Sequence, residues 1–243
     1  MRRITDIGYG LWCWLVFIPL ITGLLIFALP VPQVRIRRHM ARALARLFFK
    51  LAGTRLLVLG LENIPDSACI VVANHASYLD GIILTAALPP HFAFVIKREM
   101  ARAPLAGTLL TRLGAEFVER FDRKKGSTDA RRVLRTAARG QALAFFPEGT
   151  FNETPGLAYF HAGAFVTAAR NGLCVLPTVI HGARHMLPAG RALPRHGLLV
   201  VEILAAVAGD PAAPNAAHHL KSASRRAILS RLTEPDLETQ SDA

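Results

Sequence analysis

The sequence predicts an α/β fold with a mostly parallel central sheet flanked by helices, preceded by an N-terminal hydrophobic and amphipathic helical membrane anchor. Two observations predict the sheet: short, β-rich apolar runs recur along the chain, and helical stretches separate them. A long uncharged run near the amino terminus predicts the anchor, because crossing a bilayer takes about 20 apolar residues.

The uncharged run extends from Ile7 to Val34. A cleaved signal peptide has a shorter apolar region, about 7–15 residues, and a small-residue cleavage site, so we expect this segment to be retained. The sequence leaves two arrangements open. The run can span the bilayer, or Pro30 and Pro32 can turn the chain back into a shallow two-helix anchor in one leaflet.

A basic segment follows directly, at residues 34–55. It has no acidic residue, and its apolar positions fall at helical spacing, which predicts a basic amphipathic helix. The basic residues are Arg35, Arg37, Arg38, Arg42, Arg46, Lys50 and Arg55. Contact with anionic headgroups is one interpretation, and it places the rest of the chain on the cytoplasmic face of an inner or plasma membrane. Packing against the domain is the alternative.

The overall charge implies an anionic partner. The chain has 29 Lys and Arg against 17 Asp and Glu, a formal charge of +12. Membrane lipids or a phosphorylated substrate fit this charge, whereas aromatic residues are too few for a nucleic-acid surface that stacks bases. Three widely spaced cysteines, Cys13, Cys69 and Cys174, exclude a disulfide framework and a cysteine zinc site. We expect no metal and no bound cofactor.

Alternating patterns after residue 55 predict the order of strands and helices. The expected strands lie at residues 56–61, 68–74, 92–96, 115–119, 143–147, 175–180 and 198–207. The expected helices lie at residues 77–88, 127–139 and 162–172, with short helical pieces at 104–112.

A first chemical motif, Asn74-His75-Ala76-Ser77-Tyr78-Leu79-Asp80, follows a predicted buried strand. Histidine there can take a proton from a hydroxyl near neutral pH, and an aspartate can orient its ring. On one helix, positions five apart lie about 140° apart at 100° per residue, so His75 must sit in the turn before the helix to reach Asp80. A capping box formed by Ser77 and Asp80 is the structural alternative, and both can hold together.

A second motif, Phe146-Pro147-Glu148-Gly149-Thr150, follows another predicted strand. Glycine lets a ligand approach the backbone, and a carboxylate with a hydroxyl can hold a polyol. Alone, the motif is also an ordinary strand-to-loop turn.

The two motifs together, in this order and about seventy residues apart, resemble the glycerolipid acyltransferase family, and most closely the 1-acylglycerol-3-phosphate acyltransferases. Two further blocks resemble the family in the expected order, one at residues 114–120 and one at residues 175–180. The four blocks cover roughly residues 70–182. The resemblance implies acyl transfer from a thioester, acyl-CoA or acyl-carrier protein, to the hydroxyl of a lysophospholipid.

The resemblance also implies roles for single residues. His75 is the expected general base and Asp80 its orienting partner. The expected substrate-binding residues, including the phosphate candidates Lys97 and Arg120, are Asn74, Lys97, Gly114, Arg120, Glu148, Gly149, Thr150 and Pro177. The absence of a Gly-x-Ser-x-Gly elbow argues against a serine lipase, so the acyl group is expected to pass directly to the acceptor.

One departure from the family pattern concerns the residue after Glu-Gly-Thr. Family members often carry arginine there, whereas this chain has Phe151. A phosphate contact is lost unless Arg184 or His185 replaces it from another loop. The leading acceptor is 1-acyl-sn-glycerol-3-phosphate, with a lyso-ornithine lipid or lysophosphatidylglycerol as alternatives. A membrane-tethered nucleic-acid-binding protein is a distant alternative, and an inactive scaffold is a third.

These interpretations divide the chain into three parts. Residues 1–55 are expected to form the membrane-anchoring helical segment and residues 56–232 the acyltransferase catalytic domain. The segment 233–243 carries four acidic residues and a proline, and is expected to be a disordered acidic tail.

Overall fold

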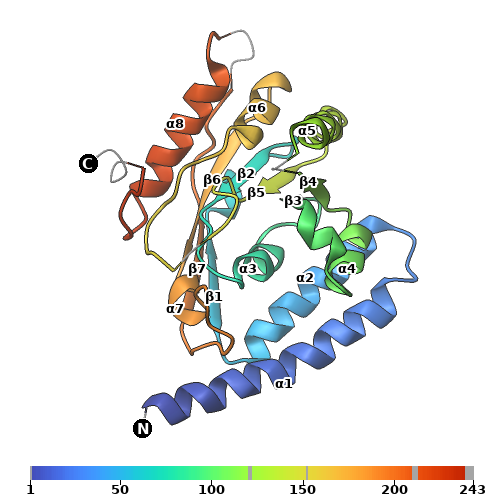
Figure 1. The fold of residues 1–243 in the computed structure, drawn as a ribbon, viewed down its shortest axis with the longest axis vertical. Coiled ribbons are helices and arrows are strands. Elements are labelled where there is room, and N and C mark those ends of the chain that lie inside the picture. Colours follow the sequence, from blue (N-terminus) through green and yellow to red (C-terminus); the bar gives the residue numbers. More distant parts are fainter. Residues whose placement is uncertain (1, 120–121, 152, 210–212, 239–243) are drawn as a thin grey trace.

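A seven-stranded sheet lies between two layers of helices in the computed structural model, which describes residues 2–119, 122–151, 153–209 and 213–238 (Figure 1). The strands are β1 (Arg55–Leu59), β2 (Ile70–Ala73), β3 (Ala93–Lys97), β4 (Glu116–Val118), β5 (Leu143–Phe145), β6 (Val175–His181) and β7 (Leu198–Ile203). Their order is β1-β7-β6-β2-β5-β3-β4, and every neighbouring pair is parallel except β6 and β7. The predicted, mostly parallel sheet is confirmed.

Helices cover both faces of the sheet (Figure 1). They are α1 (Arg2–Ala28), α2 (Val34–Leu51), α3 (Asp80–Ala87), α4 (Ala106–Arg112), α5 (Arg123–Ala138), α6 (Gly163–Arg170), α7 (Ala183–Met186) and α8 (Ala216–Leu229), with short 3₁₀ turns η1 (Leu61–Asn63) and η2 (Arg98–Arg102). All four residues of β2 are buried. Val71 and Ala73 pack on the α1–α3 side, and Ile70 and Val72 pack on the α5, α6 and α8 side. This burial on both faces explains the continuous apolar run of β2.

Two predicted boundaries shift for local reasons. The helix expected at 127–139 begins at Arg123, because Asp122 caps it by accepting hydrogen bonds from the N–H groups of Lys124 and Lys125 at 3.0 and 3.1 Å. The strand expected at 198–207 ends at Ile203, and Val207 rejoins the sheet through one antiparallel bridge to Val175.

The first two helices form an antiparallel hairpin on the domain (Figure 1). One face of α1 packs inward through Cys13, Val16, Leu24 and Ala28. The opposite face is apolar and exposed along its length, at Ile4, Ile7, Leu11, Leu15, Ile18 and Ile26. Residues Ile4–Ala28 are long and apolar enough to cross a membrane, although a buried helix or a signal sequence passes the same test.

Four arginines of α2 bond the domain, as the packing alternative expects. Arg37 donates to the carbonyl of Arg112, and Arg38 to that of Leu113 at 2.8 Å, both at the end of α4. Arg42 and Arg46 donate to the carbonyls of Ala87 and Ala86, at 3.4 and 2.9 Å, at the end of α3. Four of the seven basic side chains therefore satisfy helix C-terminal carbonyls, as the packing alternative requires. Arg35, Lys50 and Arg55 are exposed, as is the bonded Arg46.

The expectation of a disordered tail from Thr233 is wrong for residues 233–238. These residues cross the loop at 156–158 and form a parallel bridge between Asp236 and Leu157. Buried Arg225 on α8 pairs with Asp236 and Glu238. The acidic composition suggested a solvated tail, but these carboxylates have specific partners on the domain. Residues 239–243 lie outside the described residues.

Candidate active site

The two chemical motifs lie at one edge of the sheet because β2 and β5 are adjacent and parallel. His75 follows β2 after Asn74, and residues 146–150 follow β5. Both turns therefore leave the sheet at its carboxyl edge, where open α/β sheets bind ligands. Lys97 ends β3, the next strand beyond β5, at the same edge.

His75 and Asp80 are hydrogen-bonded, with 2.8 Å between Nδ1 and Oδ2. His75 lies in the turn before α3, and Asp80 is the first residue of α3. The same Oδ2 accepts the N–H groups of Ala76 at 2.7 Å and Ser77 at 2.8 Å. Ser77 Oγ accepts the N–H of Leu79 at 3.0 Å and not that of Asp80, and Leu79 is the N-cap of α3, so only the Asp80 half of the expected capping box accompanies the His–Asp pair. The expected geometry is present; the catalytic roles stay predictions.

Two aromatic rings hold the imidazole. Phe146 stacks on the His75 ring with 4.3 Å between centroids and 19° between planes. Phe151 meets it edge-on at 4.5 Å, and Tyr78 contacts Phe151 at 4.9 Å. These contacts restrict the ring to one orientation and shield it from water. Sequence reasoning identified Phe151 only as a departure from the family pattern and missed its contact with the histidine.

Glu148 joins the two motifs through the backbone. Its Oε1 accepts the N–H of His75 at 2.6 Å, and its Oε2 accepts the N–H of Ala158 at 2.8 Å. Burial raises the pKa of Glu148 to about 7; the two N–H donors and the Arg184 charge oppose this rise, and the Asp80 charge adds to it. Glu148 therefore fixes the His75 turn, while Gly149 and Thr150 line the adjacent cavity.

Three of the predicted substrate-binding residues lie in the framework around the site. The Asn74 amide bonds the backbone of Ile180 in β6 twice, at 2.7 and 3.1 Å. Pro177 is buried within β6 opposite Val72. Gly114 has a positive φ of 71° and accepts a hydrogen bond from Arg38 at 3.2 Å. Contacts of these residues with substrate stay predictions.

An apolar cavity of about 810 Å³ opens at His75. Helices α1–α4 and β3 enclose most of it. Its volume lies within the range of roughly 300–1,000 Å³ that is common for small-molecule sites. Lys97 and Arg38 are the charged residues among its described lining side chains, with His75 as the titratable one. The walls therefore suit an alkyl chain, and the positive charges along them are those of Lys97 and Arg38.

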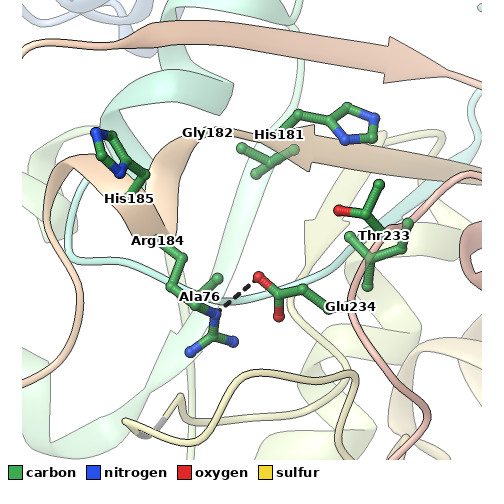
Figure 2. A pocket seen from close by; sticks show the side chains of 9 residues that line it. Ala76, His181, Gly182, Arg184, His185, Thr233 and Glu234 are labelled. Atoms are coloured by element: carbon green, nitrogen blue, oxygen red, sulfur yellow. Dashed lines mark hydrogen bonds and ion pairs between the residues drawn. The ribbon is translucent and has the colours of Figure 1, made fainter.

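A smaller, polar pocket of about 350 Å³ lies beside Ala76, the residue that follows His75 (Figure 2). Ala76 lines it, together with His181, His185 and Arg184. Arg184 donates to Glu234 of the C-terminal segment at 2.8 Å. Arg184 and His185, the candidates for replacing the arginine that is absent at position 151, thus border this polar pocket. Phe151 itself borders the apolar cavity.

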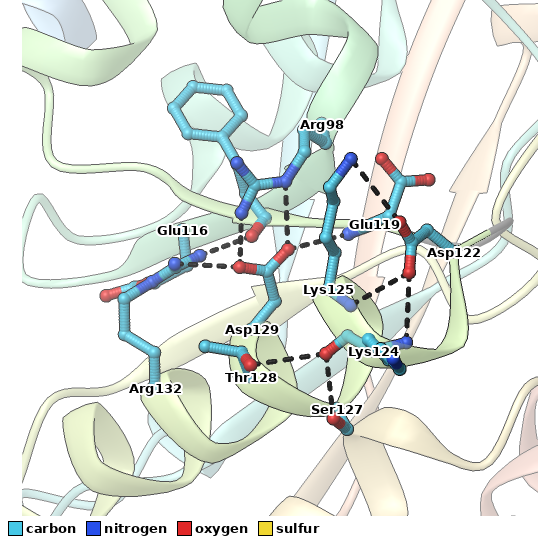
Figure 3. Close-up of polar contacts among 11 residues, drawn as sticks. Arg98, Glu116, Glu119, Asp122, Lys124, Lys125, Ser127, Thr128, Asp129 and Arg132 are labelled. Carbon is cyan, nitrogen blue, oxygen red and sulfur yellow. Dashed lines mark hydrogen bonds and ion pairs between the residues drawn. The ribbon is translucent and has the colours of Figure 1, made fainter.

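An ionic cluster around the buried Asp129 lies next to Lys97 in sequence, one of the phosphate candidates (Figure 3). Asp129 of α5 accepts hydrogen bonds from Arg98 and Arg132 at 2.9 Å each, and from the N–H of Glu119 at 2.9 Å. Arg98 directly follows Lys97, so the cluster fixes the end of β3 and the end of β4 to α5. The predicted phosphate ligand Arg120 lies outside the described residues. Sequence reasoning missed Asp129, although Asp129 and Arg132 are at pairing distance on one helix.

In the part of the chain that the structure describes, no three His, Cys, Asp or Glu side chains form a group able to hold a metal ion.

Comparisons with known proteins identify the family of the chain. The profile of the Acyltransferase family matches residues 55–181, and the chain belongs to that family. It is 31% identical over 156 residues to the chloroplastic 1-acyl-sn-glycerol-3-phosphate acyltransferase BAT2 of Brassica napus, covering 63% of this chain and 45% of that protein. It is 33% identical over 190 residues to the lyso-ornithine lipid O-acyltransferase of Pseudomonas aeruginosa, covering 76% and 67%.

The fold matches that of a solved structure, the 1-acyl-sn-glycerophosphate acyltransferase PlsC of Thermotoga maritima. The TM-score is 0.77 at 24% identity, over 94% of this chain and 95% of that one. The chain spans about half the length of several curated 1-acyl-sn-glycerol-3-phosphate acyltransferases that it matches.

We predict that Asp129→Asn lowers the free energy of unfolding at pH 7 by about 3 kcal/mol, because it leaves Arg98 and Arg132 without their buried partner. Burial raises the pKa of Asp129, but its hydrogen bonds to Arg98, Glu119 and Arg132 outweigh burial and lower it overall. The carboxylate therefore stabilises the fold above its unfolded pKa of about 3.9, and this contribution is lost as the pH falls through the lower native value.

Urea unfolding at pH 7 and pH 3 measures both effects, with Glu62→Gln as the control because Glu62 is an exposed carboxylate. A variant as stable as the wild type at pH 7, or a stability difference as large at pH 3 as at pH 7, contradicts this role.

Proposed function

We propose that the protein is an O-acyltransferase that moves a fatty acyl group from a thioester donor to the free hydroxyl of a lysolipid. The observation that carries the proposal is the hydrogen-bonded pair of His75 and Asp80 at the opening of a cavity of about 810 Å³ with mostly apolar walls. Membership of the Acyltransferase family supports it.

In this proposal His75 is the general base. The Asp80 carboxylate accepts a hydrogen bond from Nδ1–H, which leaves Nε2 as the basic nitrogen of the neutral ring. Nε2 takes the proton of the acceptor hydroxyl as its oxygen attacks the thioester carbonyl. The tetrahedral intermediate then breaks its C–S bond, and the imidazolium returns the proton to the departing thiolate. The acyl chain lies in the apolar cavity.

The proposed reaction needs a particular thioester donor and a particular lysolipid acceptor. Both acyl-CoA and acyl-carrier protein supply a thioester, so either serves as co-substrate. The first acceptor is 1-acyl-sn-glycerol-3-phosphate, because several relatives carry that activity in their names and Lys97 lines the cavity. The product is then phosphatidic acid.

Replacing the base tests the reaction. His75→Ala is expected to reduce the rate of acyl transfer by a factor of 10³ or more, because the acceptor hydroxyl loses its proton acceptor and the remaining site supplies only binding. The measurement uses radiolabelled acyl-CoA and acyl-carrier protein with lysophosphatidate in mixed micelles. His196→Ala is the control, since His196 lies against Tyr9 on α1, apart from the cavity. Turnover by His75→Ala at the wild-type rate contradicts the assignment.

A second acceptor, a lyso-ornithine lipid, is favoured by Phe151. This side chain contacts the ring of His75, so it lies within the length of a headgroup from the reacting hydroxyl. A phosphate placed against a phenyl ring loses water without gaining a hydrogen-bond donor. An amino-acid lipid has no phosphate to desolvate, and the Pseudomonas aeruginosa relative that carries this activity in its name covers 76% of this chain.

A cation at position 151 is expected to shift the choice of acceptor. Phe151→Arg should raise the ratio of kcat/KM for lysophosphatidate over lyso-ornithine lipid about tenfold, the effect of one charge-assisted hydrogen bond of about 1.4 kcal/mol. Phe151→Leu, apolar but without the ring, should leave the ratio within about twofold. The kcat/KM values of the wild type for lysophosphatidate and for lyso-ornithine lipid decide between the two acceptors. An unchanged ratio for Phe151→Arg means that residue 151 does not contact the headgroup.

We also propose that the exposed apolar face of α1 inserts into one leaflet of the membrane. The opposite face of α1 packs on the domain, which favours a helix lying along the membrane over one crossing it alone. Exposed Arg35, Lys50 and Arg55 near the hairpin support the cytoplasmic face of an inner or plasma membrane.

Removing this face should release the protein from lipid. Leu11, Leu15 and Ile18 are 59%, 65% and 55% exposed on one side of α1, and changing all three to Ser should lower co-sedimentation with phosphatidylglycerol-containing vesicles at least about tenfold. The matched control changes Leu57, Leu59 and Leu198 to Ser, since these leucines are exposed on the adjacent strands β1 and β7. Equal loss of binding in both variants contradicts a specific role for α1.

A further inference from the structure

The C-terminal residues 232–238, which we call the strap, supply backbone partners to a loop with little regular structure. Leu157 donates its N–H to the carbonyl of Pro235 at 2.8 Å and accepts the N–H of Leu237 at 3.1 Å. The N–H of Gly156 bonds the carboxylate of Glu234 at 2.8 Å. Gly156 has a φ of 142°, and a Cβ there would lie 2.4 Å from the Leu237 side chain, so this crossing requires glycine.

Arg225 of α8 holds the loop and the strap together. It is 7% exposed, and it donates to the carbonyls of Ala158 at 2.5 Å and Leu157 at 3.1 Å. It also pairs with Asp236 and, at 2.9 Å, with Glu238 of the strap. A planar guanidinium can bond two carbonyls and two carboxylates at once, whereas an ammonium group cannot match this arrangement.

The loop at 156–158 is connected to the candidate active site by two hydrogen bonds to Glu148. The N–H of Ala158 bonds Glu148 Oε2, and Glu148 Oε1 bonds the N–H of His75. Glu234, besides bonding Gly156, holds Arg184 in the polar pocket beside Ala76 (Figure 2). A continuous series of hydrogen bonds therefore runs from α8 and the strap to the turn that carries the histidine.

We propose that the strap and Arg225 are positioning elements for acyl transfer: they hold the loop at 156–158 so that Ala158 fixes Glu148 and Glu148 fixes the His75 turn. This inference rests on the proposed function for its effect on rate. Arg225 acts through the loop and does not touch substrate. A loop without these partners leaves one Glu148 oxygen without its donor, and a displacement of about 1 Å at a reacting group can cost roughly 10²-fold in rate.

Arg225→Lys is the primary test, with Arg226→Lys as its control, because Arg226 is exposed on the same helix. Arg225→Lys should lower kcat about 10- to 100-fold with the donor KM within about twofold, and hydrogen exchange at residues 156–158 should become faster. The groups facing Glu148 are His75, Asp80 and Arg184, and this variant keeps all three, with Arg184 still paired to Glu234. Loss of the Ala158 donor raises the pKa of Glu148 further, so the acid limb of the pH–rate profile should move to higher pH.

Two truncations provide a second test that does not depend on the arginine. A chain ending at Glu238 lacks only residues 239–243 and should behave as the full chain, whereas a chain ending at Arg231 lacks the strap and should lose both exchange protection and turnover. Unchanged exchange at 156–158 in Arg225→Lys and in the shorter chain overturns the inference, as does faster exchange with unchanged kcat. If the full chain transfers acyl groups to no lysolipid, the proposed function fails, and the exchange measurement still decides whether the strap holds the loop.

Discussion

The hydrogen bond between His75 and Asp80 is the contact on which the rest of the site depends. The two lie five positions apart in sequence, so a continuous helix would turn them to different faces. They meet because the histidine lies in the turn and the aspartate opens α3. Asp80 Oδ2 accepts two turn N–H groups besides the imidazole, so the atom that orients the ring also shapes the turn that presents it. A change that removes this oxygen removes both.

The sheet then fixes this turn from both sides. β2 lies between β5 and β6, and each neighbour contributes one polar link to the residues that follow β2. On the β6 side the amide of Asn74 bonds Ile180, and on the β5 side the carboxylate of Glu148 bonds the N–H of His75. Glu148 is buried in this position, and burial disfavours its charged form, which raises its pKa to about 7. His75 and Glu148, which are 73 positions apart, are thereby joined by one direct hydrogen bond.

Local patterns were sufficient for the strands, most helices and the His–Asp geometry, because each depends on periodicity or on neighbours in sequence. They were insufficient where a polar group finds its partner across the fold. The basic residues of α2 suggested contact with anionic headgroups, yet four of its arginines bond the carbonyls that end α3 and α4. The acidic residues after Thr233 read as a solvated tail, yet Arg225 and Arg184 pair with them. Composition gives the charge of a segment, whereas its partners are set by tertiary packing.

The alternation of side chains along the turn explains how one site can handle both parts of an amphipathic substrate. His75 and Ser77 border the apolar cavity, whereas Ala76 between them borders the polar pocket. An acyl chain needs walls that exclude water, and a proton transfer is helped by the same exclusion, because electrostatic interactions strengthen as water leaves. Polar groups that must stay hydrated or paired, such as Arg184 and Glu234, are kept in the pocket beside Ala76. Phe151 extends the apolar side of the turn up to the imidazole itself.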